Sequence, residues 1–425
     1  MALSDRIHDK TAVIGVVGLG YVGLPLAVSF AEAGFRVIGI DTQQDKLDAI
    51  CRCESYVGDI DDDRLEAVVS DARLRVSGSS TAGKVDVAVI CVPTPITKDK
   101  KPDLSYVVNA IWGIKYRLTD DESMVVLESS TYPGTTRETV IQILNNMVTY
   151  IAYSPERIDP GSKKFNIRNT PKLVGGIDKE STELATSLYS QIVDKVVTVS
   201  SAEIAETAKL YENVFRNVNI ALANEMALIC EKIGVSVWEV IDAAATKPFG
   251  FMPFYPGVGV GGSCIPKDPY YIVGRAKDTG SSIELIGTAL SINEEMPVHT
   301  AKWVTLTISS TLKKKAEILI LGVAFKKDVS DTRESPSVKL MNILSSWGAG
   351  VLYNDPYVPR LSDQATSVEL TDELLESADC VVIATDHSCY DWKWIVDKAR
   401  MVFDTRNATK GIVSGKIYRL GERRD

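Results

Sequence analysis

Histidine is scarce in this sequence. Three occur in 425 residues, at positions 8, 299 and 387, and none stands beside a candidate motif. Histidine is the side chain that most often moves protons near neutral pH. We interpret each of the three as a surface or helix-end residue, so proton transfer in this protein should depend on Lys, Asp, Glu or Cys.

Long apolar runs and an excess of basic residues are also missing. No stretch approaches the roughly 18 apolar residues that cross a bilayer, and residues 1–10 lack the apolar centre of a signal peptide. Lys and Arg number 47 against 56 Asp and Glu, a net charge of -9, whereas sequence-independent nucleic-acid binding needs a basic surface. The sequence predicts a cytoplasmic protein with neither membrane nor nucleic acid as partner.

Cysteines are few and scattered. There are seven, an odd number, and the close pair Cys51 and Cys53 has no second pair at the spacing of a metal site. We expect reduced thiols and no metal.

A dinucleotide-binding pattern follows the first apolar run. Residues 11–17 are rich in β-branched side chains, and the motif Gly18–Gly23 (G-L-G-Y-V-G) leads into a helical pattern. This order places a pyrophosphate at a helix N-terminus. The next strand, residues 35–40, ends in Asp41, an acid that binds the adenosine ribose and favours NAD over NADP. Strand and helix alternation over residues 1–200 predicts an NAD-binding Rossmann domain.

Ligands of such sheets gather at the carboxyl ends of the strands. Two buried strands end just before Thr94 and Thr131, where nicotinamide and substrate should meet. A third leads to Glu156 and Arg157. These two residues either belong to the site or pair with each other.

Residues 201–300 are predicted to form a helical central domain. Apolar residues recur at helical spacing over 202–233, and Lys209, Asn213 and Arg216 project from one face of that helix. This stripe is either a solvated surface or functional.

The loop Gly257–Asp268 reads G-V-G-V-G-G-S-C-I-P-K-D. Its glycines allow backbone amides to approach a ligand, and a thiol at Cys264 suggests covalent chemistry. Lys267 could supply a cation near the thiol, and Asp268 could orient a water or share a proton. The alternative is a tight loop with a merely packed thiol.

Residues 301–425 predict a second doubly wound α/β domain without the glycine motif, beginning near the basic run Lys313–Lys315. Lys326, Lys327 and Arg406 stand at strand ends. These cations either bind phosphates or form an exposed charged loop. The fold class is thus α/β, two Rossmann-like domains joined by a long-helix central domain.

These motifs together resemble the UDP-glucose/GDP-mannose dehydrogenase family over essentially the full length. Six ordered motifs carry the resemblance: Gly18–Gly23 with Asp41, Ser130–Pro133, Ser154–Arg157, Ala208–Asn213, Gly261–Asp268 and Phe325–Pro336. Within the family, Ser154–Gly161, Pro171–Gly176 and Thr246–Phe251 are similar to enzymes that oxidise UDP-N-acetylhexosamines, with UDP-N-acetylglucosamine 6-dehydrogenase nearest.

The resemblance implies an enzyme of polysaccharide biosynthesis that oxidises the sugar C6 alcohol to a carboxylate with two NAD in succession. Cys264 would trap the intermediate aldehyde as a thiohemiacetal and then carry a thioester that water hydrolyses. Lys209 and Asn213 would stabilise oxyanions. Asp268, with Glu156 or Thr131 through a water, would handle protons.

The resemblance also implies the binding residues and a homodimer built on the long helix. Residues that would contact NAD are Leu19, Gly20, Tyr21, Val22, Asp41, Lys46, Thr94 and Thr131. Residues that would bind the sugar nucleotide are Arg157, Ile158, Lys209, Asn213, Arg216, Tyr255, Gly261, Lys326, Lys327 and Arg406.

Three positions depart from the pattern. Pro160 replaces a second Glu of UDP-glucose enzymes, Lys247 stands where those enzymes reach a neighbouring subunit with an Arg, and Ser263 replaces a His that many N-acetylhexosamine members carry. The first departure removes a proton relay, the second leaves the contact across subunits open, and the third weighs against the N-acetylhexosamine subgroup.

Other functions remain open. UDP-N-acetylmannosamine or UDP-glucose are alternative substrates. A 3-hydroxy acid-type dehydrogenase would share the NAD domain but stop after one NADH and need no Cys264. A non-catalytic NAD-binding protein would form no NADH with any sugar nucleotide.

Overall fold

The structure is a computed structural model that describes residues 1–78, 81–119, 122–145, 147–158, 164–309, 316–363 and 365–422. The chain forms two compact units: residues 1–212 with 270–281, and residues 213–269 with 282–425. It passes from one unit to the other three times: inside α8 (Ala202–Ile233), inside α10 (Asp268–Asp278) and between residues 281 and 282. The three-domain division at residues 200 and 300 stays a prediction, and Pro160 and Lys313–Lys315 lie outside the described residues.

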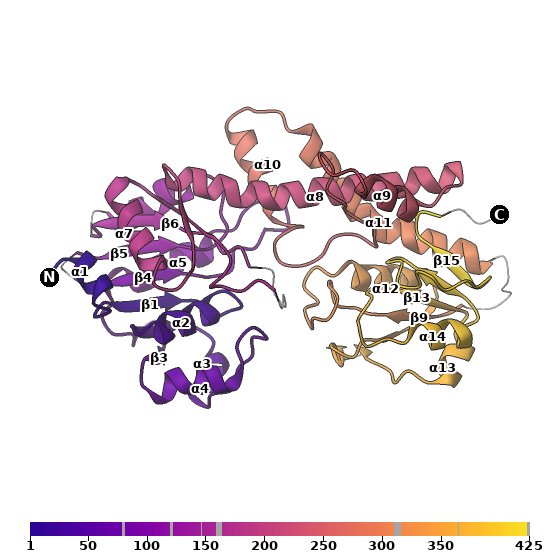
Figure 1. The fold of residues 1–425 in the computed structure, drawn as a ribbon, viewed down its shortest axis with the longest axis horizontal. Helices are drawn as coiled ribbons and strands as arrows, with labels where there is room; N and C mark the ends of the chain where they lie inside the picture. The colour runs from indigo at the N-terminus through magenta and orange to yellow at the C-terminus, as the bar shows by residue number, and fades with distance from the viewer. Residues whose placement is uncertain are drawn as a thin grey trace. The chain divides into compact units, whose positions relative to one another are not determined.

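An eight-stranded sheet forms the centre of the first unit (Figure 1). The order β3-β2-β1-β4-β5-β6-β7-β8 begins with the 3-2-1-4-5-6 arrangement of dinucleotide-binding folds. Neighbouring strands pair in parallel except β6 with β7, which pair antiparallel. The strands are β1 (Val13–Val17), β2 (Arg36–Ile40), β3 (Leu74–Ser77), β4 (Val87–Ile90), β5 (Met124–Leu127), β6 (Tyr150–Tyr153), β7 (Lys172–Gly176) and β8 (Val196–Thr198).

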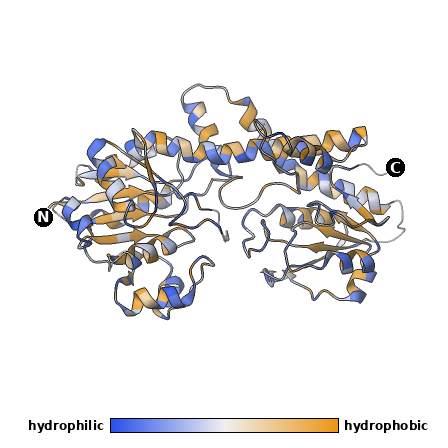
Figure 2. Cartoon of the chain, viewed as in Figure 1, coloured by the Kyte–Doolittle hydropathy of each residue, from blue (hydrophilic) through white to orange (hydrophobic). Residues whose placement is uncertain are grey.

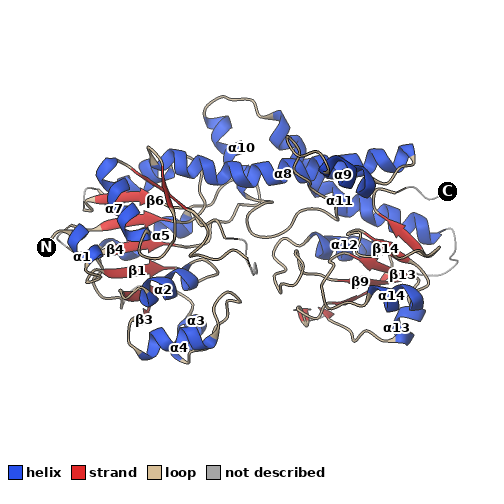
Figure 3. Cartoon of the chain, viewed as in Figure 1, coloured by secondary structure: helices blue, strands red, loops and turns tan. Residues whose placement is uncertain are grey.

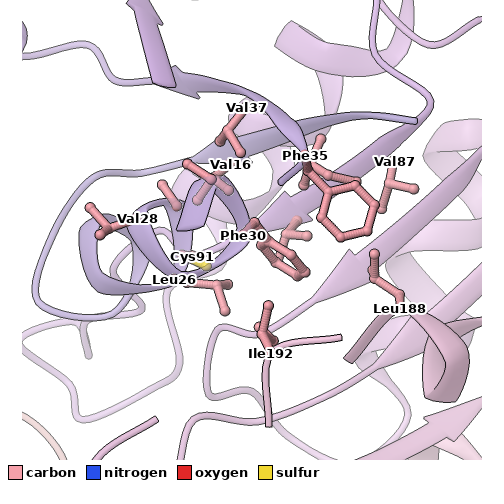
Figure 4. Packing of buried hydrophobic residues seen from close by; sticks show 14 of the residues in the cluster. Val16, Leu26, Val28, Phe30, Phe35, Val37, Val87, Cys91, Leu188 and Ile192 are labelled. Atoms are coloured by element: carbon pink, nitrogen blue, oxygen red, sulfur yellow. The ribbon is translucent and has the colours of Figure 1, made fainter. Parts of the chain in front are cut away.

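Helices cover both faces of this sheet because its strands are apolar on both sides. In β4, Val87 and Val89 join one buried cluster, whereas Ala88 and Ile90 join another. Figure 4 shows the first cluster, in which Phe30 packs edge-on against Phe35. It is closed by α1 (Leu3–His8), α2 (Gly23–Glu32), α3 (Gln44–Cys51), α4 (Asp62–Ser70) and α7 (Lys179–Tyr189); the second is closed by α5 (Ser105–Lys115), the π-helical turn η1 (Thr136–Val140) and α6 (Ile141–Leu144).

The second unit has a five-stranded parallel sheet in the order β10-β9-β13-β14-β15 (Figure 3). Figure 2 shows apolar residues concentrated along its strands. The strands are β9 (Glu317–Leu321), β10 (Gly350–Asn354), β13 (Cys380–Ile383), β14 (Val402–Asp404) and β15 (Ile417–Arg419), with a separate hairpin of β11 (Arg360–Ser362) and β12 (Ala365–Thr366). The helices are α9 (Val237–Ala245), α11 (Glu284–Ser309), α12 (Pro336–Ser346), α13 (Asp372–Ser377) and α14 (Trp392–Lys398).

Counted within its own sheet, this order is 2-1-3-4-5, a second doubly wound arrangement. The predicted fold class is therefore confirmed. Helix α11 continues through Pro297. Ala301, Val304 and Ile308 beyond the proline are buried in the core of the second sheet, and this packing offsets the lost backbone hydrogen bond.

The first helix was not predicted from the sequence. The charged amino-terminal residues form α1, which buries Leu3 and Ile7 against the first sheet. Its apolar residues are too few to stand out as a pattern. Across the described ranges, no helix combines the length and apolar character that crossing a bilayer requires.

Candidate active site

The glycine motif forms the expected turn between β1 and α2. A Cβ at Gly23 would lie 1.8 Å from the carbonyl oxygen of Gly18, so a side chain cannot fit there. A Cβ at Gly20 would meet nothing within 4 Å, so the backbone at Gly20 faces open space. Close packing at one glycine and open backbone at another is the arrangement that lets a pyrophosphate approach a helix N-terminus.

Asp41 organises this turn from the end of β2. Its carboxylate accepts hydrogen bonds from the amides of Leu19 at 2.8 Å and Gln43 at 2.9 Å, and Lys46 Nζ lies 3.4 Å away. Asp41 is buried, Val22 is half-buried and Tyr21 is 47% exposed. The predicted cofactor residues of the first two strands therefore cluster at one turn, and the residues present fit a bound dinucleotide.

Thr131 follows β5 and is fully buried. Its hydroxyl has no hydrogen-bond partner among the described residues, which is costly for a buried polar group unless a ligand supplies the partner. Thr94, after β4, is half-buried, and its carbonyl oxygen accepts a 2.8 Å hydrogen bond from Tyr271. An orphaned hydroxyl at the carboxyl end of the sheet is a second feature that fits a ligand at this edge.

Glu156 lies at the centre of a group of contacts after β6. Its carbonyl oxygen accepts a 2.6 Å hydrogen bond from Lys209 Nζ on α8. Its carboxylate accepts from the amides of Arg157 at 2.6 Å and Ile158 at 2.7 Å. The Arg157 side chain instead forms an ion pair with Glu212 at 2.7 Å. The alternative that the Glu156 and Arg157 side chains pair with each other is therefore wrong.

A buried ion network that the sequence did not predict supports Glu156. Lys172 Nζ lies 2.8 Å from Glu128 and 3.4 Å from Glu156, and the Tyr189 hydroxyl donates to Glu128. Burial raises the pKa of Glu128. Burial alone would lower the pKa of Lys172, but the carboxylates of Glu128 and Glu156 outweigh it and raise that pKa. Lys172 begins β7, Glu128 and Glu156 lie in the loops after β5 and β6, and Tyr189 ends α7. No sequence pattern links residues so far apart along the chain.

Asparagines of α8 hold the thiol loop within the second unit. Asn213 Nδ2 donates to the Asp268 carboxylate at 2.6 Å, and Asn217 Nδ2 donates to the carbonyl of Ile265 at 3.2 Å. Asn224 accepts from the amide of Gly257 at 3.0 Å. Asn213 was a predicted site residue. Asn217 and Asn224 were missed, although their spacing of four and eleven residues from Asn213 places them on the same face of a helix.

Cys264 is half-buried, unlike the buried Cys91, Cys230 and Cys380. Its Sγ lies 3.4 Å from the Ser263 hydroxyl, and its carbonyl accepts from the amides of Lys267 and Asp268, which closes a turn at the start of α10. The thiol is thus not packed into a core.

The structure shows what the glycines and Lys267 of this loop contact. Its glycines lie against the protein itself: a Cβ at Gly261 would lie 2.6 Å from Phe325, and one at Gly257 would lie 2.7 Å from the Arg406 guanidinium. Lys267, which could supply a cation near the thiol, forms an ion pair with Glu334 at 3.4 Å, because the loop packs against the segment that follows β9.

Three cations predicted to bind the sugar nucleotide lie in the second unit: Lys326, Lys327 and Arg406. Lys327 Nζ and Arg406 Nε lie 3.7 Å and 3.4 Å from the two carboxylate oxygens of Asp386. Both cations are exposed, and Lys326 is half-buried. Tyr255 stacks on Trp238 and donates to Asp242 at 2.9 Å. The three residues predicted to share one face of α8 differ in exposure: Lys209 is half-buried, Asn213 is buried and Arg216 is exposed.

His387 was expected at the surface or at a helix end and is instead fully buried within a loop. Its Nε2 lies 3.1 Å from Asp355, and its Nδ1 accepts a 2.9 Å hydrogen bond from the amide of Asp328. Burial alone would raise the pKa of Asp355, but hydrogen bonds from His387 and the amides of Ala324 and Val323 lower it. Asp355 directly follows β10, the second strand of its sheet along the chain, just as Asp41 directly follows β2. His387 contacts both Asp355 and the amide of Asp328, so it joins Asp355 to the loop that carries Lys327.

Comparison with known proteins decides the family. The NAD binding domain model of the UDP-glucose/GDP-mannose dehydrogenase family matches residues 12–193, its central domain model matches 203–295 and its UDP binding domain model matches 319–411. The chain belongs to this family. It is therefore an NAD-dependent nucleotide-sugar dehydrogenase, and the predicted enzyme class and cofactor are confirmed.

Relatives named UDP-N-acetyl-D-mannosamine dehydrogenase share about a third of its residues. That of Pyrococcus horikoshii is 36% identical over 422 residues, 96% of this chain and 98% of the relative; that of Escherichia coli is 35% identical, over 89% and 94%. The Pyrococcus horikoshii structure, named for the same activity, has a TM-score of 0.87 at 34% identity over 96% of this chain and 99% of that one.

A UDP-glucose dehydrogenase structure from Pyrobaculum islandicum matches almost as well, with a TM-score of 0.86 at 27% identity over 97% and 98% of the two chains. Backbone similarity therefore does not identify the sugar. UDP-N-acetylglucosamine, the first choice from sequence, is not confirmed, whereas the alternative UDP-N-acetylmannosamine is supported by the names of these relatives.

Proposed function

We propose that this protein oxidises the C6 alcohol of UDP-N-acetyl-D-mannosamine to the uronate with two NAD. The observation that carries the choice of sugar is the agreement of names among relatives that match nearly the whole chain. The covalent route is supported by a half-buried thiol whose loop is held by buried asparagines.

NAD, when bound, accepts the electrons of each oxidation. A carboxylate takes the proton of the C6 hydroxyl through a water, and Asp268 and Glu156 are the candidates. The Cys264 thiolate attacks the aldehyde carbon, forming a C–S bond and an oxyanion. After the second oxidation a water attacks the thioester and gives a proton to one of these carboxylates, the C–S bond breaks, and the thiolate and the carboxylic acid separate.

Lys209 and Asn213 lie one turn apart on α8 and suit the oxyanions. A lysine ammonium has three N–H donors, and Lys209 directs one of them to the Glu156 carbonyl. Asn213 has two amide N–H donors and directs one of them to Asp268. Each side chain therefore has a further donor beyond that bond, and each is held in place by a residue of the proposed catalytic set.

We further infer a homodimer formed through α8. Apolar side chains recur on this helix at intervals of four or seven residues and remain 39% to 69% exposed: Tyr211, Phe215, Leu222, Ile229 and Ile233. Such a stripe is typical of a helix that packs against another helix.

A panel of UDP-sugars tests the substrate. UDP-N-acetylmannosamine, UDP-N-acetylglucosamine, UDP-N-acetylgalactosamine and UDP-glucose are each incubated with NAD, and NADH formation is followed. We expect kcat/KM for UDP-N-acetylmannosamine to exceed the others by at least about tenfold. A higher value for UDP-N-acetylglucosamine would restore the first choice from sequence, and no NADH with any sugar would favour the non-catalytic alternative.

A further inference from the structure

Helix α10 belongs partly to the cofactor-binding unit, although it lies far along the chain from the rest of that unit. Residues 270–281 are assigned to the first unit. Tyr271 is fully buried, and its hydroxyl donates to the carbonyl oxygen of Thr94 at 2.8 Å. The loop after β4, which carries a proposed cofactor contact, is therefore bonded to a residue 177 positions away.

Arg275, one turn further along α10, contacts the loop after β5 and the turn η1 that follows it. Its Nη1 lies 3.2 Å from Glu138, with a second, closer contact through Nη2, and its guanidinium lies 5.7 Å from the centre of the Tyr132 ring. Packing there is tight, since a Cβ at Gly134 would lie 2.9 Å from the Arg275 guanidinium. Glu138 and Tyr132 flank Gly134 in the segment that carries Thr131.

The two contacts therefore fall on the two loops that the cofactor should touch. Tyr271 and Arg275 are four residues apart and lie on one face of α10. The same helix begins at Asp268, the last residue of the thiol loop, one turn before Tyr271. Along the chain, α10 thus runs from the last residue of the thiol loop to the two residues that contact the cofactor loops.

We propose that Tyr271 and Arg275 are positioning residues that hold the Thr94 and Thr131 loops for the second oxidation. The inference rests on the proposed function. A half-oxidised sugar bound to Cys264 completes the reaction only if the cofactor loops keep the correct place, and displacements near 1 Å cost about 100-fold in rate. Without these contacts the two loops would move more, which would slow the second oxidation and let the aldehyde leave before it is oxidised.

The variants are Tyr271→Phe and Arg275→Met, singly and together. Tyr271→Phe keeps the buried ring and removes the hydrogen bond. Tyr270→Phe is the matched control, because it removes a neighbouring hydroxyl whose partner, Lys100 Nζ at 2.7 Å, belongs to a different segment of the loop after β4. Hydrogen exchange is measured on the protein alone, and aldehyde is trapped with a carbonyl reagent during turnover.

We expect amide exchange to quicken by about tenfold at Thr94, Ile96 and Thr97 in Tyr271→Phe and at the non-proline residues of 131–138 in Arg275→Met. In the double variant, kcat should fall by about tenfold or more, trapped aldehyde should appear, and NADH per sugar should drop below two. Tyr270→Phe should match the wild type in trapped aldehyde and in NADH per sugar.

Unchanged exchange, or a double variant that keeps two NADH per sugar and a kcat within about threefold of wild type, would overturn the positioning role. A lowered melting temperature with normal stoichiometry would also overturn it, by showing a purely structural contact. If the wild type forms no NADH, the proposed function fails, and the exchange measurement still decides whether α10 orders the loops.

Discussion

Lys209 donates a hydrogen bond to the backbone carbonyl oxygen of Glu156, with Nζ 2.6 Å from that oxygen. The contact joins the long helix α8 to the segment after β6. Because the Glu156 carboxylate is turned to Lys172 and two backbone amides, one residue links a half-buried ammonium to a buried ion network. Catalysis and stability should therefore both be sensitive to this part of the first unit.

Replacing Lys209 with Ala should lower kcat by about 100-fold, because an oxyanion would lose a charged donor. Steady-state NADH formation measures the effect. Lys232→Ala, an exposed lysine near the end of the same helix, is the control and should retain wild-type turnover. A loss of less than about threefold in Lys209→Ala would assign that residue to structure.

Lys172→Met should destabilise the protein by about 3–5 kcal/mol, because it leaves Glu128 buried without its cation. Urea denaturation measures the change. The double variant Lys172→Met with Glu128→Gln should recover much of the loss, since the uncompensated charge is gone. A single variant within about 1 kcal/mol of wild type would show that the network contributes little.

Glu206 should make stability depend on pH. Its carboxylate accepts from the amides of Gly134 and Thr136, and burial raises its pKa to about 7. The folded state then keeps a proton up to about pH 7 that the unfolded chain releases near pH 4.5. The free energy of unfolding should fall by up to about 3 kcal/mol as pH rises through this window.

The comparison variant for this effect is Glu206→Gln, which cannot titrate. Urea denaturation of both proteins across the window should show a smaller decrease with pH in the variant. Parallel pH profiles would show that another group causes the dependence.

The double variant Leu222→Lys with Ile229→Lys should convert a dimer to a monomer, because two lysines would replace apolar contacts in the α8 stripe. Light scattering after gel filtration measures the mass. Val413→Lys, at a fully exposed position elsewhere in the second unit, is the control. A wild-type protein that is already monomeric, or a variant that stays dimeric, would contradict this interface.

Local sequence patterns predicted the glycine turn and the long helix, but not the buried contacts that surround the candidate site. Gly18–Gly23, Asp41 and the bounds of α8 could be predicted because each depends on local spacing. Lys172, Glu128 and His387 could not, because their partners lie in other strands and loops and meet only in the folded sheet. Pro297 illustrates a related effect, since tertiary packing of α11 outweighs a local helix breaker.

The substrate remained open for a different reason. Epimeric sugars differ in the direction of one hydroxyl, which is recognised by the geometry of a few side chains rather than by a motif. Cys264 and Asp268 point to the proposed reaction, whereas no residue pattern in this chain indicates the configuration of the sugar.

The most direct test of the covalent route is uronate release by Cys264→Ser, with NAD affinity measured on the same preparation. We predict that the variant binds NAD as the wild type does and releases no detectable uronate from the sugar nucleotide that the wild type oxidises. Uronate release at the wild-type rate would contradict a thiol-bound intermediate.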